Sequence, residues 1–148
     1  MPRLDASEQA YPAFRFVVQI DGMQGATFTQ CTLPALEVEV EERQEGGYND
    51  GSHVLPKRVK RGTITLKRGM ASGSALLGWY LAVLAGEISK STRQVSIIML
   101  DSQGDTIMRW DFAGAYPVKW SGPELDAGSN QVAIETLELA YESLTVVQ

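Results

Sequence analysis

The sequence contains few residues that carry enzyme chemistry. One cysteine, Cys31, and one histidine, His53, occur in 148 residues. A lone cysteine excludes an internal disulfide, and a chain of this length forms a core without one. One thiol, one imidazole and scattered acids predict no metal cluster, and no Gly-rich phosphate loop is present. We therefore expect no cofactor, no metal and no enzyme activity.

Two readings of the cysteine and histidine remain. A Cys31–His53 nucleophilic pair is formally possible, but no motif supports it. The simpler interpretation makes Cys31 a small buried apolar side chain and His53 a solvated or interface residue.

The chain also lacks a long apolar run and an excess of basic residues. Its longest apolar run, "ALLGWYLAVLAG" at 75–86, is shorter than the ~20 residues that span a bilayer. The start "MPRLDASEQAYPAF" has no apolar signal segment, so we expect no membrane anchoring. The formal net charge of −5 disfavours general nucleic-acid binding.

Alternating apolar and polar residues predict short β-strands along most of the chain. In one predicted strand Val38 and Val40 are expected to face inward, opposite the outward row Glu37, Glu39 and Glu41. The predicted strand ranges are 14–20, 26–33, 36–42, 63–69, 93–101, 106–115 and 130–147.

The last predicted strand has two faces of different character. Leu137, Leu139 and Tyr141 point one way, and the opposite face consists of Thr136, Glu138 and Glu142. The inward phase shifts near Ile134, which predicts a bulge there. In the segment before it, Pro117 and Pro123 restrict any strand to a sheet edge.

One helix is predicted over about 74–86. Ser72 or Ser74 can cap its start, and Gly86 can end it in a left-handed conformation. Its apolar side chains Leu77, Leu81 and Leu84 share a face with Tyr80. Strands with one helix between them predict a mainly β chain: an antiparallel sandwich or barrel with one flanking helix, as a single domain over 1–148.

The segment 43–62, "RQEGGYNDGSHVLPKRVKRG", shows no clear period. A structureless loop of this length is uncommon inside a compact domain. It is therefore either a functional loop or an extended β-arm.

Charges cluster on both sides of this segment. Residues 37–45 hold five Glu against one Arg, and the later block contains Lys57, Arg58, Lys60 and Arg61. One copy could dock its basic arm on the acidic side of the next, a head-to-tail contact that builds rings or filaments. The alternative is that both blocks are solvated faces. Paired carboxylates could also serve a glycosidase, but their regular rows favour a solvated strand face.

Long stretches of the chain resemble the tube proteins of contractile phage tails and phage-tail-like injection systems. They are "FTQCTLPALEVEVEERQEGGYNDGSHVLPKRVKRGTITLKRGM", the helix with "LGWY", and "IIMLDSQGDTIMRWDFAGAYPVKWSGPELDAGSNQVAIETLELAYESL". The resemblance covers roughly residues 11–144. The sequence differs from the residues usual in this family at 32–34, at Gln44 and at Lys57. These differences concern the geometry of the loops and not the resemblance as a whole.

The resemblance implies a structural role without enzyme activity. Such proteins form rings, usually hexamers, that stack into a hollow tube whose strands join a β-barrel shared between subunits. The implied partners are a contractile sheath, baseplate and tube-initiator proteins, and cargo in the lumen, either DNA or a protein toxin. Assembly is expected in the cytoplasm of a bacterial cell, as part of a phage tail or an injection particle.

Two sets of residues take roles under this resemblance. We expect Glu37, Glu39, Glu41, Glu138 and Glu142 to face the lumen, where a negative wall would repel DNA phosphates and many cargo surfaces. The arm 43–62 is expected to contact the neighbouring ring, through Arg43, Glu45, Tyr48, Asn49, Asp50, His53, Lys57, Arg58, Lys60 and Arg61.

Two other functions remain open. One is a tube-initiator or baseplate-adapter protein of the same fold, present in few copies per particle. The other is a small β-sandwich binding module that acts as a monomer or dimer.

Overall fold

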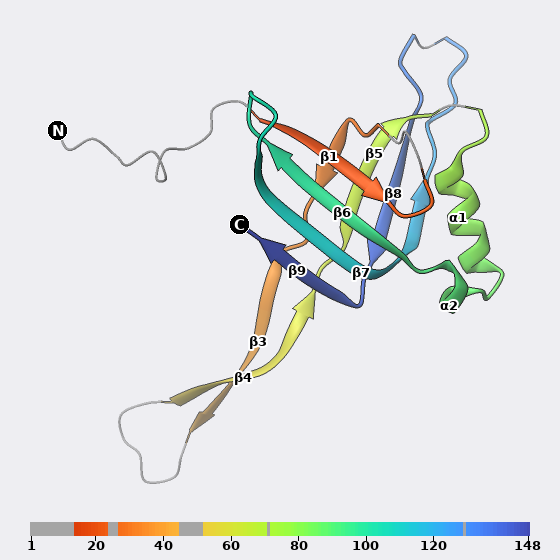
Figure 1. Cartoon of the computed structure of the whole chain (residues 1–148). Helices are drawn as coiled ribbons and strands as arrows, with labels where there is room; N and C mark the ends of the chain where they lie inside the picture. The colour runs from red at the N-terminus through yellow and green to blue at the C-terminus, as the bar shows by residue number, and fades with distance from the viewer. Residues whose placement is uncertain (1–13, 24–26, 45–51, 71, 129) are drawn as a thin grey trace.

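The computed structural model describes residues 14–23, 27–44, 52–70, 72–128 and 130–148. Within these ranges the chain is built mainly of antiparallel strands, with one longer and one short helix (Figure 1). The mainly β class predicted from the alternation is confirmed. The elements are β1 (Arg15–Ile20), β2 (Gln30–Thr32), β3 (Leu36–Gln44), β4 (Ser52–Arg61), β5 (Ile64–Gly69), α1 (Ala75–Leu84), α2 (Ile88–Ser91), β6 (Arg93–Leu100), β7 (Thr106–Ser121), β8 (Ile134–Ala140) and β9 (Ser143–Val147).

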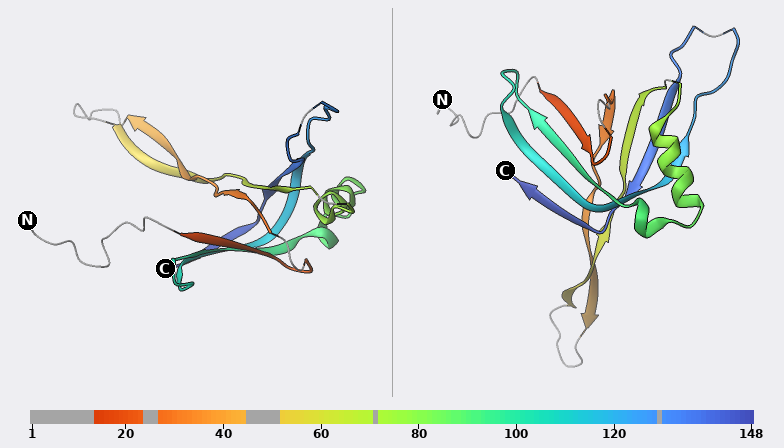
Figure 2. Two further views of the ribbon diagram at one scale, coloured as in Figure 1. Left: turned by 90° about the horizontal axis from the view of Figure 1, so that it is seen from above. Right: turned by 45° about the vertical axis from the view of Figure 1, so that its right-hand side comes forward.

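One seven-stranded sheet folds over on itself at β7. Its order is β1-β6-β7-β8-β5-β2, and β9 also pairs with β7. The first part of β7 pairs with β6 and β9, and Tyr116–Ser121 pairs with β8. Gly114, near the end of the first part where the register with β6 shifts, has φ 63°, a left-handed conformation that costs glycine little. Viewed from above, β5 therefore lies across from β1 and β6 (Figure 2, left).

The core fills the space between the two halves of this sheet. Val18, Ile97 and Phe112 from one half are buried, as are Leu66 and Leu137 from the other. All belong to a single cluster of buried apolar residues. The inward face predicted for Leu137, Leu139 and Tyr141 is confirmed.

The last predicted strand is in fact two strands. β8 ends at Ala140 and β9 begins at Ser143, and between them the Glu142 N–H donates to the carbonyl of Ala113 at 2.9 Å. The predicted bulge near Ile134 is wrong, because the strand begins at that residue and 122–133 form the connection before it.

Pro117 lies where the sequence places it, on a locally unpaired side of its strand. In the described part of the chain, the register of β7 with β6 ends at Ala115, so Tyr116–Ser121 pairs with β8 alone. A bulge between Pro117 and Lys119 accompanies this change. Proline lacks an N–H to donate, and a strand paired on one side has no need of it there.

Helix α1 is present where the sequence predicts it. The hydroxyl of Ser74 accepts from the N–H of Leu77 at 3.2 Å, which caps the first turn. Gly86 has φ 88° just after the helix, as predicted for its end. The face toward the sheet carries Leu76 and Trp79. The apolar face predicted from Leu81 and its neighbours is therefore not the buried one.

Strands β3 and β4 form a separate two-stranded sheet that projects from the main sheet (Figure 1). Its register runs from Leu36 opposite Arg61 to Gln44 opposite Ser52. The loop alternative for 43–62 is wrong for Ser52–Arg61, and the β-arm alternative is confirmed there. A register shift next to Val40, opposite Pro56, breaks the alternation that would have revealed the strand.

Candidate assembly surfaces

The acidic and basic blocks lie opposite each other in the β3–β4 hairpin. Glu37 is the register partner of Lys60, and Glu39 is the partner of Arg58. Opposite charges at directly opposed positions stabilise an antiparallel pair. Charge docking between copies is therefore not needed to explain the two blocks, because the chain already places them side by side.

The hairpin presents apolar side chains to solvent. Leu36 is 64% exposed, Val38 52% and Val40 61%. The prediction that Val38 and Val40 face inward is wrong, because their strand leaves the main sheet and has no core beneath it. These three alternate positions share one face of β3, so the hairpin carries an uncovered apolar row.

The residues expected in the arm are placed only in part. The structure places Arg43, His53, Lys57, Arg58, Lys60 and Arg61 in the hairpin strands, whereas Glu45, Tyr48, Asn49 and Asp50 lie outside the described residues. Arg43 and His53 are register partners near the far end, and Arg61 lies at the base. Cys31 lies in β2 of the other sheet, opposite Leu66, so the fold does not support a Cys31–His53 pair.

The outer face of β8 carries mixed charge. Glu138 is the register partner of Thr65 in β5 and of Lys119 in β7, and Thr136 is the partner of Lys67. A lysine thus stands opposite the carboxylate of Glu138. This polar face, made of Thr65, Lys67, Lys119, Thr136 and Glu138, is the outer surface of the sheet half formed by β5, β8 and the end of β7.

The five carboxylates expected in one lumen wall are separated by the fold. Glu37, Glu39 and Glu41 lie in β3, whose partner is β4, whereas β8 pairs with β5 and β7. Within one subunit the two rows of carboxylates therefore do not lie on neighbouring strands. Glu142 is exposed at the corner between β8 and β9, close to Gly114.

A buried carboxylate that the sequence analysis missed ties the helix to the sheet. Glu135 is fully buried, and its Oε1 accepts from Arg68 Nε at 2.6 Å. Its Oε2 accepts from Ser74 Oγ at 2.7 Å and from Trp120 Nε1 at 3.1 Å. The alternation of the sequence could have predicted this burial, since Glu135 lies on the same face of its strand as Leu137. This Glu135 cluster joins β5, β7 and β8 to the start of α1.

Hydrogen bonding keeps Glu135 charged in spite of its burial. Burial alone would raise the pKa of its carboxyl group, but the bonds from Arg68, Ser74 and Trp120, with the Arg68 charge, hold that pKa below its usual value. Asp111, on the other half of the sheet, also has a lowered pKa because Ser96 and then Arg109 donate to it. Burial raises the pKa of the Cys31 thiol to about 11, so that thiol is unreactive.

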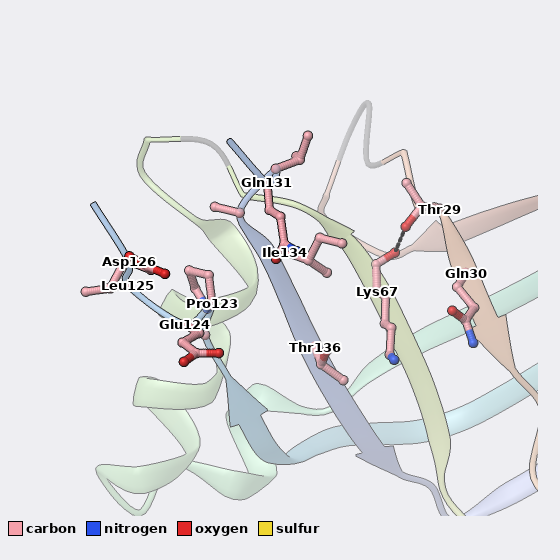
Figure 3. A pocket seen from close by; sticks show the side chains of 13 residues that line it. Thr29, Gln30, Lys67, Pro123, Glu124, Leu125, Asp126, Gln131, Ile134 and Thr136 are labelled. Atoms are coloured by element: carbon pink, nitrogen blue, oxygen red, sulfur yellow. Dashed lines mark hydrogen bonds between the residues drawn. The ribbon is translucent and has the colours of Figure 1, made fainter. Parts of the chain in front are cut away.

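A recess lies between β2, β5, β8 and the connection that precedes β8 (Figure 3). It has a volume of about 750 Å³ and holds Lys67, Glu124 and Asp126. The carboxylate of Asp126 accepts from the N–H of Gly128 at 3.0 Å and so serves its own turn. Across the described ranges, no group of three His, Cys, Asp or Glu side chains could hold a metal ion. The recess thus offers polar surface and no recognisable catalytic set.

None of the described helices has both the length and the apolar character needed to cross a membrane.

Comparison with known families identifies the class of the chain. The family described as "T4-like virus tail tube protein gp19" matches residues 12–145. The chain therefore belongs to this family of tail tube proteins, and its role is that of a structural tube protein. The resemblance predicted from the sequence is confirmed. A comparison with curated protein sequences gave no match.

Solved structures with a similar fold include chains of the anti-feeding prophage and of an extracellular contractile injection system. A chain in the anti-feeding prophage baseplate is 30% identical, with a TM-score of 0.75, and the match covers 94% of this chain and 97% of that one. A chain in the anti-feeding prophage tube-terminating cap has 22% identity, a TM-score of 0.82 and coverages of 98% and 95%. One in the sheath-tube complex of the extracellular contractile injection system PVC has 20% identity, a TM-score of 0.75 and coverages of 98% and 99%.

Proposed function

We propose that this chain is the main inner-tube subunit of a contractile tail or injection system. Rings of identical copies, six in each, stack into a hollow tube inside a contractile sheath. The observation that supports this most directly is the family match over residues 12–145. The projecting hairpin, with its exposed apolar row, supports it independently, because a two-stranded ribbon is marginal without further contacts.

The polar face is the surface we assign to the lumen. Lys119 and Glu138 stand opposite each other on it, with Thr65 beside them. A wall of polar groups without a large net charge of one sign binds DNA or protein cargo only weakly. Glu37, Glu39 and Glu41 extend this lumen surface along the hairpin, where Glu37 and Glu39 are opposite Lys60 and Arg58 of the neighbouring strand, and Glu142 lies at its corner.

The arm contacts the next ring in this proposal. Its residues are the ten of the 43–62 segment named in the sequence analysis, and its partners are copies of the same chain. The sheath, the baseplate and a tube initiator are the other partners, and assembly takes place in the bacterial cytoplasm before the particle is released or fired. The tube performs no catalysis.

Electron microscopy of the purified protein tests this function. Rings with sixfold class averages, and hollow tubes at higher concentration, are the expected result. A protein that sediments as a monomer or dimer at every concentration and salt level would instead fit the binding-module alternative.

A second role is favoured by one comparison. The relative with 30% identity was solved as part of a baseplate, which fits a tube initiator or baseplate adapter of the same fold. Quantifying copies per particle separates the two roles. A main tube protein is present in many rings, and an adapter in one.

A further inference from the structure

Helix α1 is apolar on all sides yet covered on only one. Its ten residues, ALLGWYLAVL, include no charged side chain. Leu76 and Trp79 are buried against the sheet, whereas Leu81 is 52% and Leu84 64% exposed on the outside. A helix that is hydrophobic all round is normally buried, and contiguous apolar surface marks an interaction site. The exposed face of α1 therefore needs a partner in the assembled state.

The β3–β4 hairpin also carries an apolar surface that no described part of the single subunit covers. Leu36, Val38 and Val40 form its uncovered apolar row, and no third strand among the described residues pairs with the hairpin. The apolar face of a β-ribbon and an apolar helix face are surfaces that pack together in ordinary layered folds.

The two surfaces lie at opposite ends of the molecule. In both Figure 1 and the left view of Figure 2, the hairpin projects away from the side that carries α1. Two different surfaces at opposite ends cannot cover each other within one copy. Between copies they form a heterologous contact, the type that closes rings or continues as filaments.

We propose that the apolar row Leu36, Val38 and Val40 of one copy packs on the Leu81–Leu84 face of α1 in the next copy. This inference rests on the proposed tube function and names the partner of the arm. The occupant of the α1 face is a second copy of this chain, and the sheath contacts other parts of the tube surface.

Cysteine crosslinking tests the contact. The variant Val38→Cys with Leu84→Cys, in a Cys31→Ser background, is assembled and then oxidised. We expect a ladder of disulfide-linked oligomers on a non-reducing gel, whereas each single-cysteine variant gives at most a tenth as much linked product. Tubes that form normally but yield no ladder would overturn the contact while leaving the tube function intact. Failure of the unmodified protein to form any tube would overturn both.

A charge-rescue pair keeps the test decisive if the cysteines disturb assembly. Val40→Lys and Leu84→Glu alone are each expected to reduce tube yield at least tenfold, and the double variant to restore most of it. Leu125→Glu, at a residue 91% exposed elsewhere on the surface, is the matched control with normal yield. If Leu84→Glu tubes form normally but no longer recruit sheath, the helix face belongs to the sheath and the proposal is wrong.

Discussion

Arg68 Nε lies 2.6 Å from Oε1 of Glu135, a carboxylate with no exposed surface. The pair joins neighbouring strands β5 and β8, in which Arg68 and Glu135 are register partners. Ser74 and Trp120 complete the hydrogen bonding of the same carboxylate. A buried charge is tolerated only when it is paired and hydrogen-bonded in this way.

Removing this carboxylate should strongly destabilise the subunit. Glu135→Ala leaves Arg68 without its partner and frees the helix cap, and breaking a buried pair costs about 3–5 kcal/mol. Glu135→Gln keeps part of the hydrogen bonding and should cost less. Chemical denaturation gives the free energy of unfolding. Glu138→Gln on the polar face is the control, with an expected change within about 0.5 kcal/mol. An equal loss of unfolding free energy in Glu135→Ala and in Glu138→Gln would contradict the role of the cluster.

Acid should weaken the fold through the same carboxylate. The pKa of Glu135 is lowered in the folded state, so the unfolded chain takes up its proton first as the pH falls. Its stabilising contribution is complete above the ordinary carboxyl pKa, about 4.3, and disappears as the pH falls from there through the lower folded value. Asp111 adds a contribution of the same sign.

Denaturation midpoints measured from neutral pH into this acid range check the prediction. The wild type should lose stability below about pH 4.3, and Glu135→Gln should show a flatter profile over the same range. Parallel profiles for the two proteins would contradict the prediction.

Reversing one side of the hairpin ladder should damage it, and reversing both sides should restore it. Glu37→Lys with Glu39→Lys places like charges opposite Lys60 and Arg58, and each opposed pair contributes roughly 0.2–1 kcal/mol. Adding Lys60→Glu and Arg58→Glu restores opposite charges in exchanged positions. Tube yield under low and high salt is the measurement. If the variant with all four substitutions assembles no better than the variant with two, these residues do not act through cross-strand charge pairing.

Gly114 should not tolerate a side chain. Its φ of 63° is left-handed, and an added Cβ would lie 2.6 Å from Cδ of Glu142. Gly114→Ala should therefore lower the free energy of unfolding by about 1–2 kcal/mol or more. Adding Glu142→Ala should recover only the part due to the contact. Gly78→Ala is the control, because an added Cβ there meets no atom within 4 Å beyond the backbone of its own helix, and alanine favours the helix. A neutral Gly114→Ala would show that β7 can bend without glycine.

Sequence alternation predicted the strands that have one face on the core. Leu137 and Leu139 show the pattern because their opposite face is polar. The same reasoning failed for Val38 and Val40, since alternation reveals that a strand has two faces but not whether a core lies beneath one of them. In the hairpin, the apolar row faces solvent in the single subunit.

Other features depend on contacts that a local pattern does not contain. The pairing of Glu37 with Lys60 joins residues far apart in the chain, and it becomes visible only with the register. β4 was hidden by Pro56 and the register shift beside it. Glu135 was in the correct phase for burial, but its charge suggested an exposed position because its partners Arg68, Ser74 and Trp120 come from other elements.

A cryo-EM reconstruction of the protein polymerised from purified subunits tests the central claim most directly. The account predicts a hollow tube of stacked rings in which the face of Thr65, Lys119 and Glu138 lines the lumen and each hairpin packs on another copy. A stable monomer with its hairpin folded back on its own sheet, or a polymer with the polar face turned outward, would contradict it.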